Sequence, residues 1–304
     1  MLLSKFLQPR TIEDFTKADS WNEVLKESPQ QAIKRFIDDG ALIRADLGEH
    51  LSYKFKVTEL KNMLKQRGLP VSGRKDEMIG RLVQADPEGM KKAIEGLNVI
   101  HCSGQGSRLA ESYLDSEKEK RAKVEQQVMD AIKRRAFQEA SRLVASFEAE
   151  QVFPRGLNID WKNDNSSRDV TILNNIFASL PKQLGNLRPE LVEQFRVAAG
   201  MVHLWGTSHG KEWVTTNETT GLTFDSDAII RMLVSYGLYS HEIADYKKIG
   251  VKKVEILTCN DSDVCDACQK LASRTYRLSE VPEMPYEKCT CESGCRCGIA
   301  PDEF

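Results

Sequence analysis

Seven cysteines in the last 46 residues are the side chains best suited to chemistry in this chain. Thiolate sulfur can ligate a metal ion, form a disulfide or act as a redox group. Cys265 and Cys268 form a Cys-x-x-Cys, and two Cys-x-Cys pairs follow at 289–291 and 295–297. The remaining cysteines are Cys259, close to this group, and Cys102, far from it in sequence. The question is which of the three chemistries this spacing serves.

The spacing favours a structural zinc site, because two cysteine groups separated by a loop can surround one tetrahedral ion. We expect Cys265, Cys268 and Cys295 as ligands, with Cys291 or Cys289 as the fourth. Cys297 is an alternate ligand, although we expect it, like Cys259, to pack beside the site. Disulfides and a redox pair are the weaker alternatives, and the excess of thiols leaves room for a second ion.

Composition limits the setting in which these thiols act. The formal net charge is −2, hydrophobic residues make up 40% and charged residues 29%, as in a globular protein with a core. No apolar run approaches the roughly 20 residues of a membrane span, and the first residues do not form a secretion signal. We therefore expect a cytoplasmic protein without membrane contact, in which ordinary thiols stay reduced.

Residues 51–85 carry a local excess of positive charge, with eight Lys or Arg against three acidic residues. Apolar spacing predicts two short helices, and Gly68, Pro70 and Gly73 interrupt them with a loop. Basic side chains beside a helix N-terminus can meet phosphates. The candidate DNA-binding residues are Lys54, Lys56, Lys61, Lys65, Arg67, Gly73, Arg74, Lys75 and Arg81.

This stretch closely resembles the SAP motif, a helix–extended loop–helix module. The matching residues are Val57, Leu60, Leu64, Gly68, Leu69, Gly73, Lys75, Met78, Ile79, Arg81 and Leu82. The resemblance implies DNA binding with weak or shape-based sequence preference. A basic hairpin used only for protein contacts is the alternative interpretation.

The cysteine-rich end, over residues 254–301, resembles the C-terminus of phage head-morphogenesis (minor head) proteins. In those proteins a strand leads to Cys-x-x-Cys, which is followed by a proline-rich stretch, Cys-Arg-Cys and a terminal strand. This chain has "CTCESG" where a histidine–proline step is usual, so Cys291 would replace the histidine. The whole chain is similar to bacterial SAP-containing proteins of unassigned function. This resemblance implies an architecture and no activity.

The pattern along the chain predicts five segments around these motifs. We expect an N-terminal helical segment at 1–50, the DNA-binding module at 51–97, a long amphipathic helix at 107–151, a helical domain at 152–250 and the zinc-binding tail at 251–304. The apolar stripe of 107–151, from Val124 to Phe147, must pack against the next domain or a partner, so this helix is a candidate for protein contact or self-association.

Local signals refine this outline. Glycine and proline predict one helix within 28–40 and another within 187–206. The segment "HCSGQGSR" (101–108) is interpreted as a linker whose Gly-x-Gly lacks the preceding strand of a phosphate loop. Residues 225–250 suggest two helices broken near Gly237, the threonine-rich 211–225 a short hairpin, and "VKKVEIL" (251–257) a strand.

A mainly α fold with a small cysteine-rich zinc knuckle carrying short strands is therefore expected. We expect a DNA-binding protein rather than an enzyme. The alternative catalytic group is His203, His209, Asp225 and Asp227, whose residue types suit a hydrolytic metal site although the spacing matches no catalytic signature. A DNA-processing, nuclease-like enzyme using 203–227 is thus one rival function, and a phage-derived head-morphogenesis or packaging protein is another.

Overall fold

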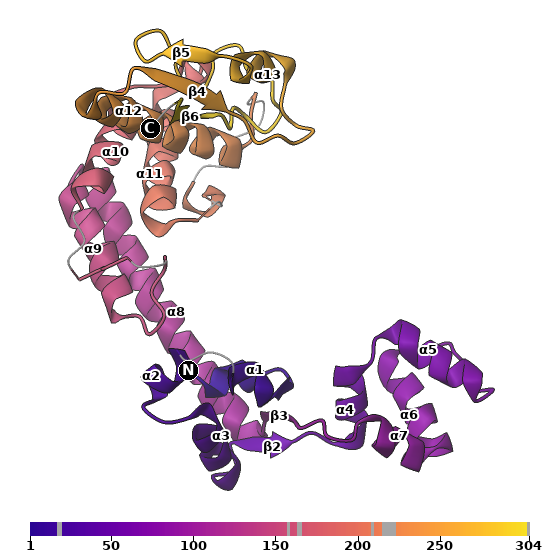
Figure 1. The fold of residues 1–304 in the computed structure, drawn as a ribbon. Helices are drawn as coiled ribbons and strands as arrows, with labels where there is room; N and C mark the ends of the chain where they lie inside the picture. Colours follow the sequence, from indigo (N-terminus) through magenta and orange to yellow (C-terminus); the bar gives the residue numbers. More distant parts are fainter. Residues whose placement is uncertain (17–19, 157–158, 163–165, 208–209, 215–222, 303–304) are drawn as a thin grey trace. The chain divides into compact units, whose positions relative to one another are not determined.

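The computed structural model describes residues 1–16, 20–156, 159–162, 166–207, 210–214 and 223–302. The chain divides into two compact units, residues 1–120 and 121–304 (Figure 1). Among the described residues, helices predominate in both units, and each unit has one antiparallel sheet of three short strands, which confirms the mainly α fold class. Within the described ranges, no helix is both long enough and apolar enough to cross a membrane.

The first unit is built on a small sheet in which β3 (Val99–Cys102) lies between β1 (Arg10–Thr11) and β2 (Leu42–Arg44), antiparallel to both. Phe6, Ile33 and Ile100 lie in its core. The surrounding helices are η1 (Leu3–Phe6), α1 (Glu13–Thr16), α2 (Ser20–Leu25) and α3 (Pro29–Asp38). Helix α3 begins as the sequence predicts, because the Ser28 hydroxyl accepts a hydrogen bond from the Gln31 N–H at 3.2 Å.

Residues 101–108 are not the linker that their glycines suggested. His101 and Cys102 belong to β3, the central strand of the sheet, and helix α8 (Gly104–Lys133) begins two residues after that strand. A Cβ at Gly106 would collide with the carbonyl group of Ala41. This glycine therefore permits close backbone packing at the start of the helix, which composition alone does not distinguish from flexibility.

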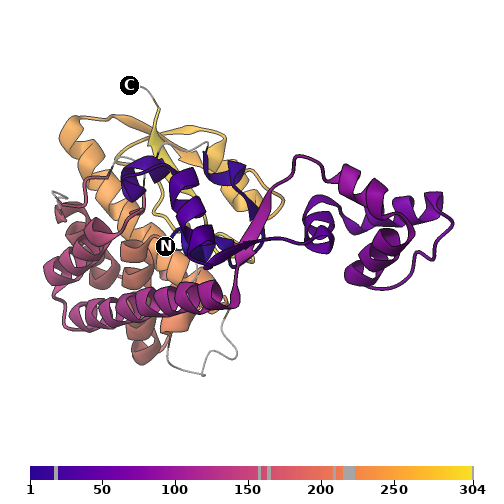
Figure 2. The same cartoon turned by 90° about the horizontal axis from the view of Figure 1, so that it is seen from below.

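The basic module, residues 47–94, is inserted between the paired strands β2 and β3. It comprises α4 (Leu47–Lys54), α5 (Val57–Gln66), α6 (Lys75–Ala85) and α7 (Pro87–Ala93). Figure 2 shows two neighbouring segments of chain leading to these four helices. The junction is fastened by the Ala45 N–H, which donates to the Val99 carbonyl at 3.0 Å, and by His50 Nε2, which accepts from the Val99 N–H at 3.2 Å.

A separate apolar core holds the basic module together. Leu60 and Leu64 of α5 and Leu82 of α6 are fully buried, as the helical spacing predicts. Leu51 of α4 and Met90 of α7 complete this core. The two-helix hairpin is thus covered by a flanking helix at each end, and the module begins a few residues earlier than the expected boundary at 51.

The expected single helix at 107–151 is two helices, α8 and α9 (Phe137–Glu150). The break falls at Arg135, whose φ of 64° is left-handed, and the Ala136 N–H donates to the Ala131 carbonyl at 2.9 Å. This is the hydrogen bond that closes a Schellman helix end, here made without glycine. The predicted apolar stripe is nevertheless buried on both sides of the break, through Val128 in α8 and Val144 in α9.

The second unit packs these stripes with the helices that follow, so the segments expected at 107–151 and 152–250 share one core. That core includes Ile172, Phe195, Trp205 and Leu233. The elements are α10 (Ser167–Ala178), η2 (Lys182–Leu184), α11 (Pro189–Trp205), η3 (Lys211–Trp213) and α12 (Ser226–Ile249). Most of the expected hairpin at 211–225 lies outside the described residues.

Helix α12 passes through Gly237 without the break that we expected there. A Cβ at Gly237 would lie 2.7 Å from Ile176 Cγ1 and 3.0 Å from the Ile172 carbonyl oxygen. Asn175 Nδ2 donates to the Gly237 carbonyl at 3.1 Å. The glycine therefore lets α12 and α10 approach closely, and packing outweighs its low helix propensity.

The C-terminal part of this unit is a sheet in the order β5 (Thr275–Arg277), β4 (Lys253–Leu257), β6 (Gly298–Pro301), with helix α13 (Asp266–Ala272) after β4. Strand β4 confirms the predicted strand at 251–257. Ile256 and Ile299 pack with Tyr239 and Ile243 of α12. Figure 1 shows this sheet beside α12, which is how the cysteine-rich tail is supported.

Replacing Val128 by Asp tests whether the stripe is core. Val128 has 0% of its surface exposed, so a carboxylate there would be buried without a partner, and we expect a loss of about 3 kcal/mol or more in the free energy of unfolding. The neighbouring exposed Gln127→Asp is the matched control and should change stability little. Chemical denaturation with circular dichroism measures both, and equal stability of the two variants would contradict this packing.

Candidate metal centre and nucleic-acid interface

Three segments of the tail bring six cysteines together. Cys265 is the N-cap residue of α13 and Cys268 lies in the first turn of this helix, so both thiols project from one helix end. The other four come from the loop between β5 and β6, which carries Cys289, Cys291, Cys295 and Cys297. We call these six residues the six-thiol cluster.

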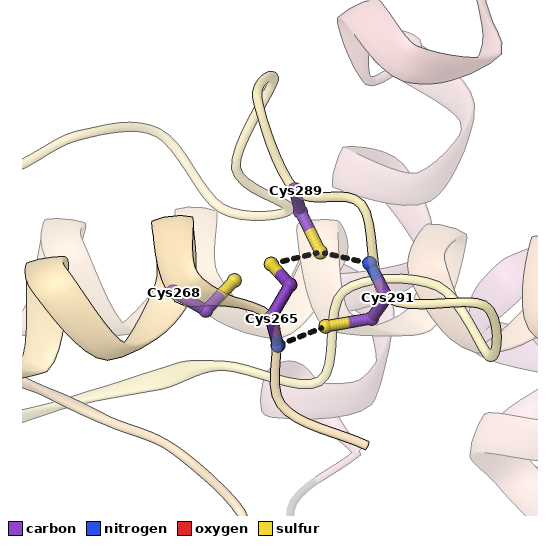
Figure 3. A group of neighbouring side chains, drawn as sticks. All are labelled: Cys265, Cys268, Cys289 and Cys291. Carbon is purple, nitrogen blue, oxygen red and sulfur yellow. Dashed lines mark hydrogen bonds between the residues drawn. The ribbon is translucent and has the colours of Figure 1, made fainter.

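Four of the sulfurs form a compact group. The ligand atoms of Cys265, Cys268, Cys289 and Cys291 all lie within 4.8 Å of one another, and the Cys265 and Cys289 sulfurs are 3.9 Å apart. In a zinc tetrahedron with Zn–S bonds of about 2.3 Å, sulfurs are about 3.8 Å apart. Figure 3 shows the four side chains converging from α13 and from the loop. This arrangement fits a tetrahedral metal ion.

A second group shares one member with the first. The sulfurs of Cys268, Cys295 and Cys297 also lie within 4.8 Å of one another. Cys295 is 1% exposed and Cys268 is fully buried. The structure therefore places the alternate Cys289, rather than the expected Cys295, in the four-thiol group, and places Cys295 and the second alternate, Cys297, in the adjoining one.

Backbone N–H groups point at several sulfurs of the cluster. The N–H of Thr290 donates to Cys265 Sγ, that of Cys265 to Cys291 Sγ and that of Tyr286 to Cys295 Sγ, each at 3.3 Å. Such donors stabilise thiolate over thiol, and metal ligation requires thiolate. These N–H groups thus stabilise part of the negative charge on the closely spaced sulfurs.

The sulfur atoms also act on one another. Hydrogen bonds from the Cys289 and Cys297 thiols lower the pKa of Cys295 to about 2, whereas burial and the charge of Cys295 raise the pKa of Cys268 to about 12. Burial opposes ionisation at Cys265, but the N–H groups of Thr290 and Cys268 outweigh it and lower its pKa to about 6. The pKa values of neighbouring sulfurs are thus shifted in opposite directions.

Charged and polar side chains fix the cysteine loop in place. Arg296 forms two hydrogen bonds of 2.7 Å with the carboxylate of Asp261. Gln183 Nε2 donates to the Cys289 carbonyl at 3.0 Å, and Arg231 Nη2 donates to the Ser293 carbonyl at 2.5 Å. The loop is thus tied to the β4–α13 segment, η2 and α12. These positioning residues follow from no spacing signal in the sequence.

The other two cysteines lie outside the cluster. Cys259 is exposed, with its sulfur 3.8 Å from the Arg296 carbonyl oxygen. Cys102 is buried in the first unit, where its thiol donates to the Leu3 carbonyl at 3.4 Å and burial raises its pKa.

The alternative catalytic residues have structural partners where they are described. His203 Nε2 lies 3.0 Å from Asp169 Oδ1, and Asp225 caps α12 by accepting from the Ala228 N–H at 2.7 Å. Asp227 accepts from the N–H groups of Gly210 and Lys211 at 3.0 and 3.1 Å. His209 lies outside the described residues. Among the described part of the chain, the groups able to hold a metal ion consist of cysteines alone.

Four of the expected DNA-binding cations are engaged within the basic module. Arg67 pairs with Asp86 at 2.6 Å, and Lys75 Nζ donates to the Ser52 carbonyl at 2.6 Å. The Arg81 guanidinium donates to the carbonyls of Pro70 and Ser72 in the loop, and Lys54 Nζ donates to the Ala93 carbonyl at 2.5 Å. These side chains fasten the loop and the flanking helices to the hairpin.

The other four cations are exposed on the surface of the module. Lys56 precedes α5, Lys61 and Lys65 lie one turn apart on α5, and Arg74 is the N-cap residue of α6. The Arg74 side chain is 80% exposed and lies within 3.9 Å of Asp76 and 3.5 Å of Glu77, on the same helix end. We call Lys56, Lys61 and Lys65, which form no ion pair in the described structure, the free cation set.

Gly73 shapes the loop between the two helices. Its φ of 110° is a conformation that side chains rarely adopt, and a Cβ there would collide with the carboxylate of Glu77. Glu77 itself accepts a hydrogen bond from the Arg74 N–H at 3.1 Å, which closes the start of α6. Gly73 therefore permits a loop conformation that a residue with a side chain would strain.

Comparison with known proteins identifies one domain. Residues 54–87 match the SAP domain, which is a DNA-binding module and spans the two helices and the loop described above. No curated protein and no solved structure matched the chain. The expected SAP module is confirmed, whereas the resemblance of the tail to phage head-morphogenesis proteins finds no support beyond its residues.

Two glycines of the module give a matched test of the loop. Gly73→Ala should destabilise the module by about 1–2 kcal/mol because alanine is strained at this positive φ. Gly80→Ala should instead stabilise it by about 1 kcal/mol, since Gly80 lies in α6 with open space around its Cα. Hydrogen exchange of the α5 and α6 amides in the full chain measures both. The same sign for both variants would contradict this account of the loop.

Proposed function

We propose that the chain is a DNA-binding protein whose SAP domain holds duplex DNA through its phosphates, with low sequence specificity. The division between engaged and free cations carries this proposal. Arg67, Lys75 and Arg81 have carbonyl or carboxylate partners, whereas the side chains of Lys56, Lys61 and Lys65 are exposed and have no recorded partner in the described structure. Exposed lysines are suited to phosphate contact.

The positions of these exposed cations suit the charged backbone of DNA. Lys61 and Lys65 are separated by one helical turn, so both lie on the same side of α5. Arg74 stands at the start of α6, where backbone N–H groups and the helix dipole also favour an anion. Lysine contacts to phosphate carry no base information, which is why we propose low sequence specificity.

We further propose that the six-thiol cluster binds zinc and that this zinc is structural. An all-thiolate tetrahedral site is typical of zinc or of an iron–sulfur centre, and the excess of protein ligands would leave no open position for a catalytic water. Five of the six cysteines are buried, with only 0–7% of their surface exposed, as a closed metal site requires. We propose a reducing cytoplasm as the setting, where such thiols stay available for metal.

We propose binding rather than catalysis, because His203, Asp225 and Asp227 already have partners within the second unit. A plasmid incubated with the protein and Mg²⁺ or Mn²⁺ tests this. Nicking that depends on Asp227 would instead support the DNA-processing alternative. The packaging alternative rests on resemblance of the tail alone.

Removing two free cations should weaken DNA binding without unfolding the module. For Lys61→Ala/Lys65→Ala, we expect the slope of log K against log salt to fall by about 2, equally for unrelated duplexes. Lys118→Ala/Lys123→Ala on α8 removes the same charge elsewhere and should leave the slope unchanged. Fluorescence anisotropy at several salt concentrations measures this, and an unchanged slope in the first variant would exclude α5 as the DNA contact.

Loss of a cluster thiol should release the metal and loosen the tail. Cys268→Ser should reduce zinc content and increase proteolysis within residues 251–302, because Cys268 belongs to both sulfur groups. Cys259→Ser should retain zinc and protease resistance, since Cys259 lies outside the cluster. DNA binding should persist in both. Iron with visible absorption in the purified protein would contradict zinc, and a metal-free but protease-resistant tail would contradict a metal site altogether.

A further inference from the structure

The six-thiol cluster offers more sulfur than one ion can use. A tetrahedral zinc takes four thiolates, and the group of Cys265, Cys268, Cys289 and Cys291 already supplies them. Cys295 and Cys297 would then be left beside the site, although both are buried and Cys295 is only 1% exposed. The contacts of these two thiols show what else they can do.

The contacts define a second set of four sulfurs around Cys295 and Cys297. Cys268, Cys295 and Cys297 lie within 4.8 Å of one another. Cys289 lies within the same distance of Cys268, as a member of the first group, and its thiol interacts with that of Cys295. A tetrahedron has six edges, and four of those joining Cys268, Cys289, Cys295 and Cys297 are sulfur–sulfur distances within 4.8 Å. The two edges that join Cys289 to Cys295 and to Cys297 are not among them.

We propose that the six-thiol cluster binds two zinc ions that share the sulfurs of Cys268 and Cys289. Cys265 and Cys291 complete the tetrahedron of the first ion, and Cys295 and Cys297 complete that of the second. Six thiolates then provide eight ligand positions, because each shared sulfur serves both ions. This inference rests on the proposed zinc site and specifies its stoichiometry and connectivity.

The surroundings are consistent with a cluster of thiolates around two ions. Backbone N–H groups donate to both unshared sulfurs of the first ion, those of Cys265 and Cys291. Another N–H donates to the Cys295 sulfur of the second ion. The shared Cys289 sulfur also accepts from the Cys291 N–H at 3.4 Å. These donors offset the negative charge that remains when six thiolates surround two divalent ions. The Arg296–Asp261 pair holds the chain between Cys295 and Cys297 in position.

Counting ions in the reduced, full-length protein tests the stoichiometry. Native mass spectrometry with elemental analysis should give about two zinc ions per chain. Cys297→Ala should retain about one, in the Cys265 tetrahedron, whereas the control Cys259→Ala should retain about two. Saturation of the wild type at a single zinc, unaffected by Cys297→Ala, would overturn the two-ion proposal but leave the proposed zinc site intact. Absence of any bound metal would overturn both.

Cobalt substitution tests whether the ions share sulfurs. Titration of the metal-free protein with Co²⁺ should give a high-spin paramagnetic resonance signal that rises with the first equivalent and falls with the second, because shared thiolates couple the two spins. A signal that rises in proportion to bound cobalt through both equivalents would show two separate ions and would overturn the shared role of Cys268 and Cys289. DNA binding measured on the same samples reports on the SAP domain independently.

Discussion

The close approach of six sulfurs, five of them in buried residues, is the constraint on which the C-terminal part of the molecule depends. Thiolates this close repel one another, and thiols this numerous give a core of small groups with little apolar area. The sheet β5–β4–β6 has strands of only three to five residues, and much of its buried surface comes from these cysteines and from side chains of α12. Zinc would neutralise part of the thiolate charge and become the main source of stability of the tail. This follows because the free energy of zinc binding contributes directly to the free energy of folding when the unfolded chain has no preformed site.

The basic residues of the SAP domain fall into two classes, those that hold the fold together and those that are exposed to solvent. Arg67, Lys75 and Arg81 are basic residues that the fold itself uses, to hold Asp86, Ser52 and the loop carbonyls. Their removal would weaken DNA binding by distorting the module, which is a different effect from removing a phosphate contact. Lys61, Lys65 and Arg74 are exposed, and they are therefore the residues at which binding can be changed while the fold is kept.

Patterns that depend on neighbouring residues could be predicted from the sequence, whereas those set by distant contacts could not. The SAP helices, the cap of α3 and strand β4 follow from local spacing. The helix break at Arg135 does not, because neither glycine nor proline marks it. The linker expected around Gly106 and the helix break expected at Gly237 are wrong for the same reason. Each position requires glycine because a residue distant in sequence packs against it, and the local sequence does not show that neighbour.

The cysteines show how far sequence reasoning reaches at a site. Their clustering predicts metal binding, but which sulfurs share an ion depends on how the loop after Tyr286 folds over α13. The N–H donor of Thr290 and the anchoring by Arg231 and Gln183 have no signature of their own. Spacing alone therefore favoured Cys295 as a partner of Cys265, whereas the folded loop brings Cys289 to that position.

Hydrogen exchange with and without a strong zinc chelator, under reducing conditions, tests the central claim that metal ligation holds the tail together. The account predicts that the chelator removes protection from the amides of β4 and β6 and from α13, while α5 and α6 of the SAP domain keep theirs. Unchanged protection of β4 and β6 after complete removal of metal would contradict it, because the tail would then be stable through thiol and side-chain packing alone.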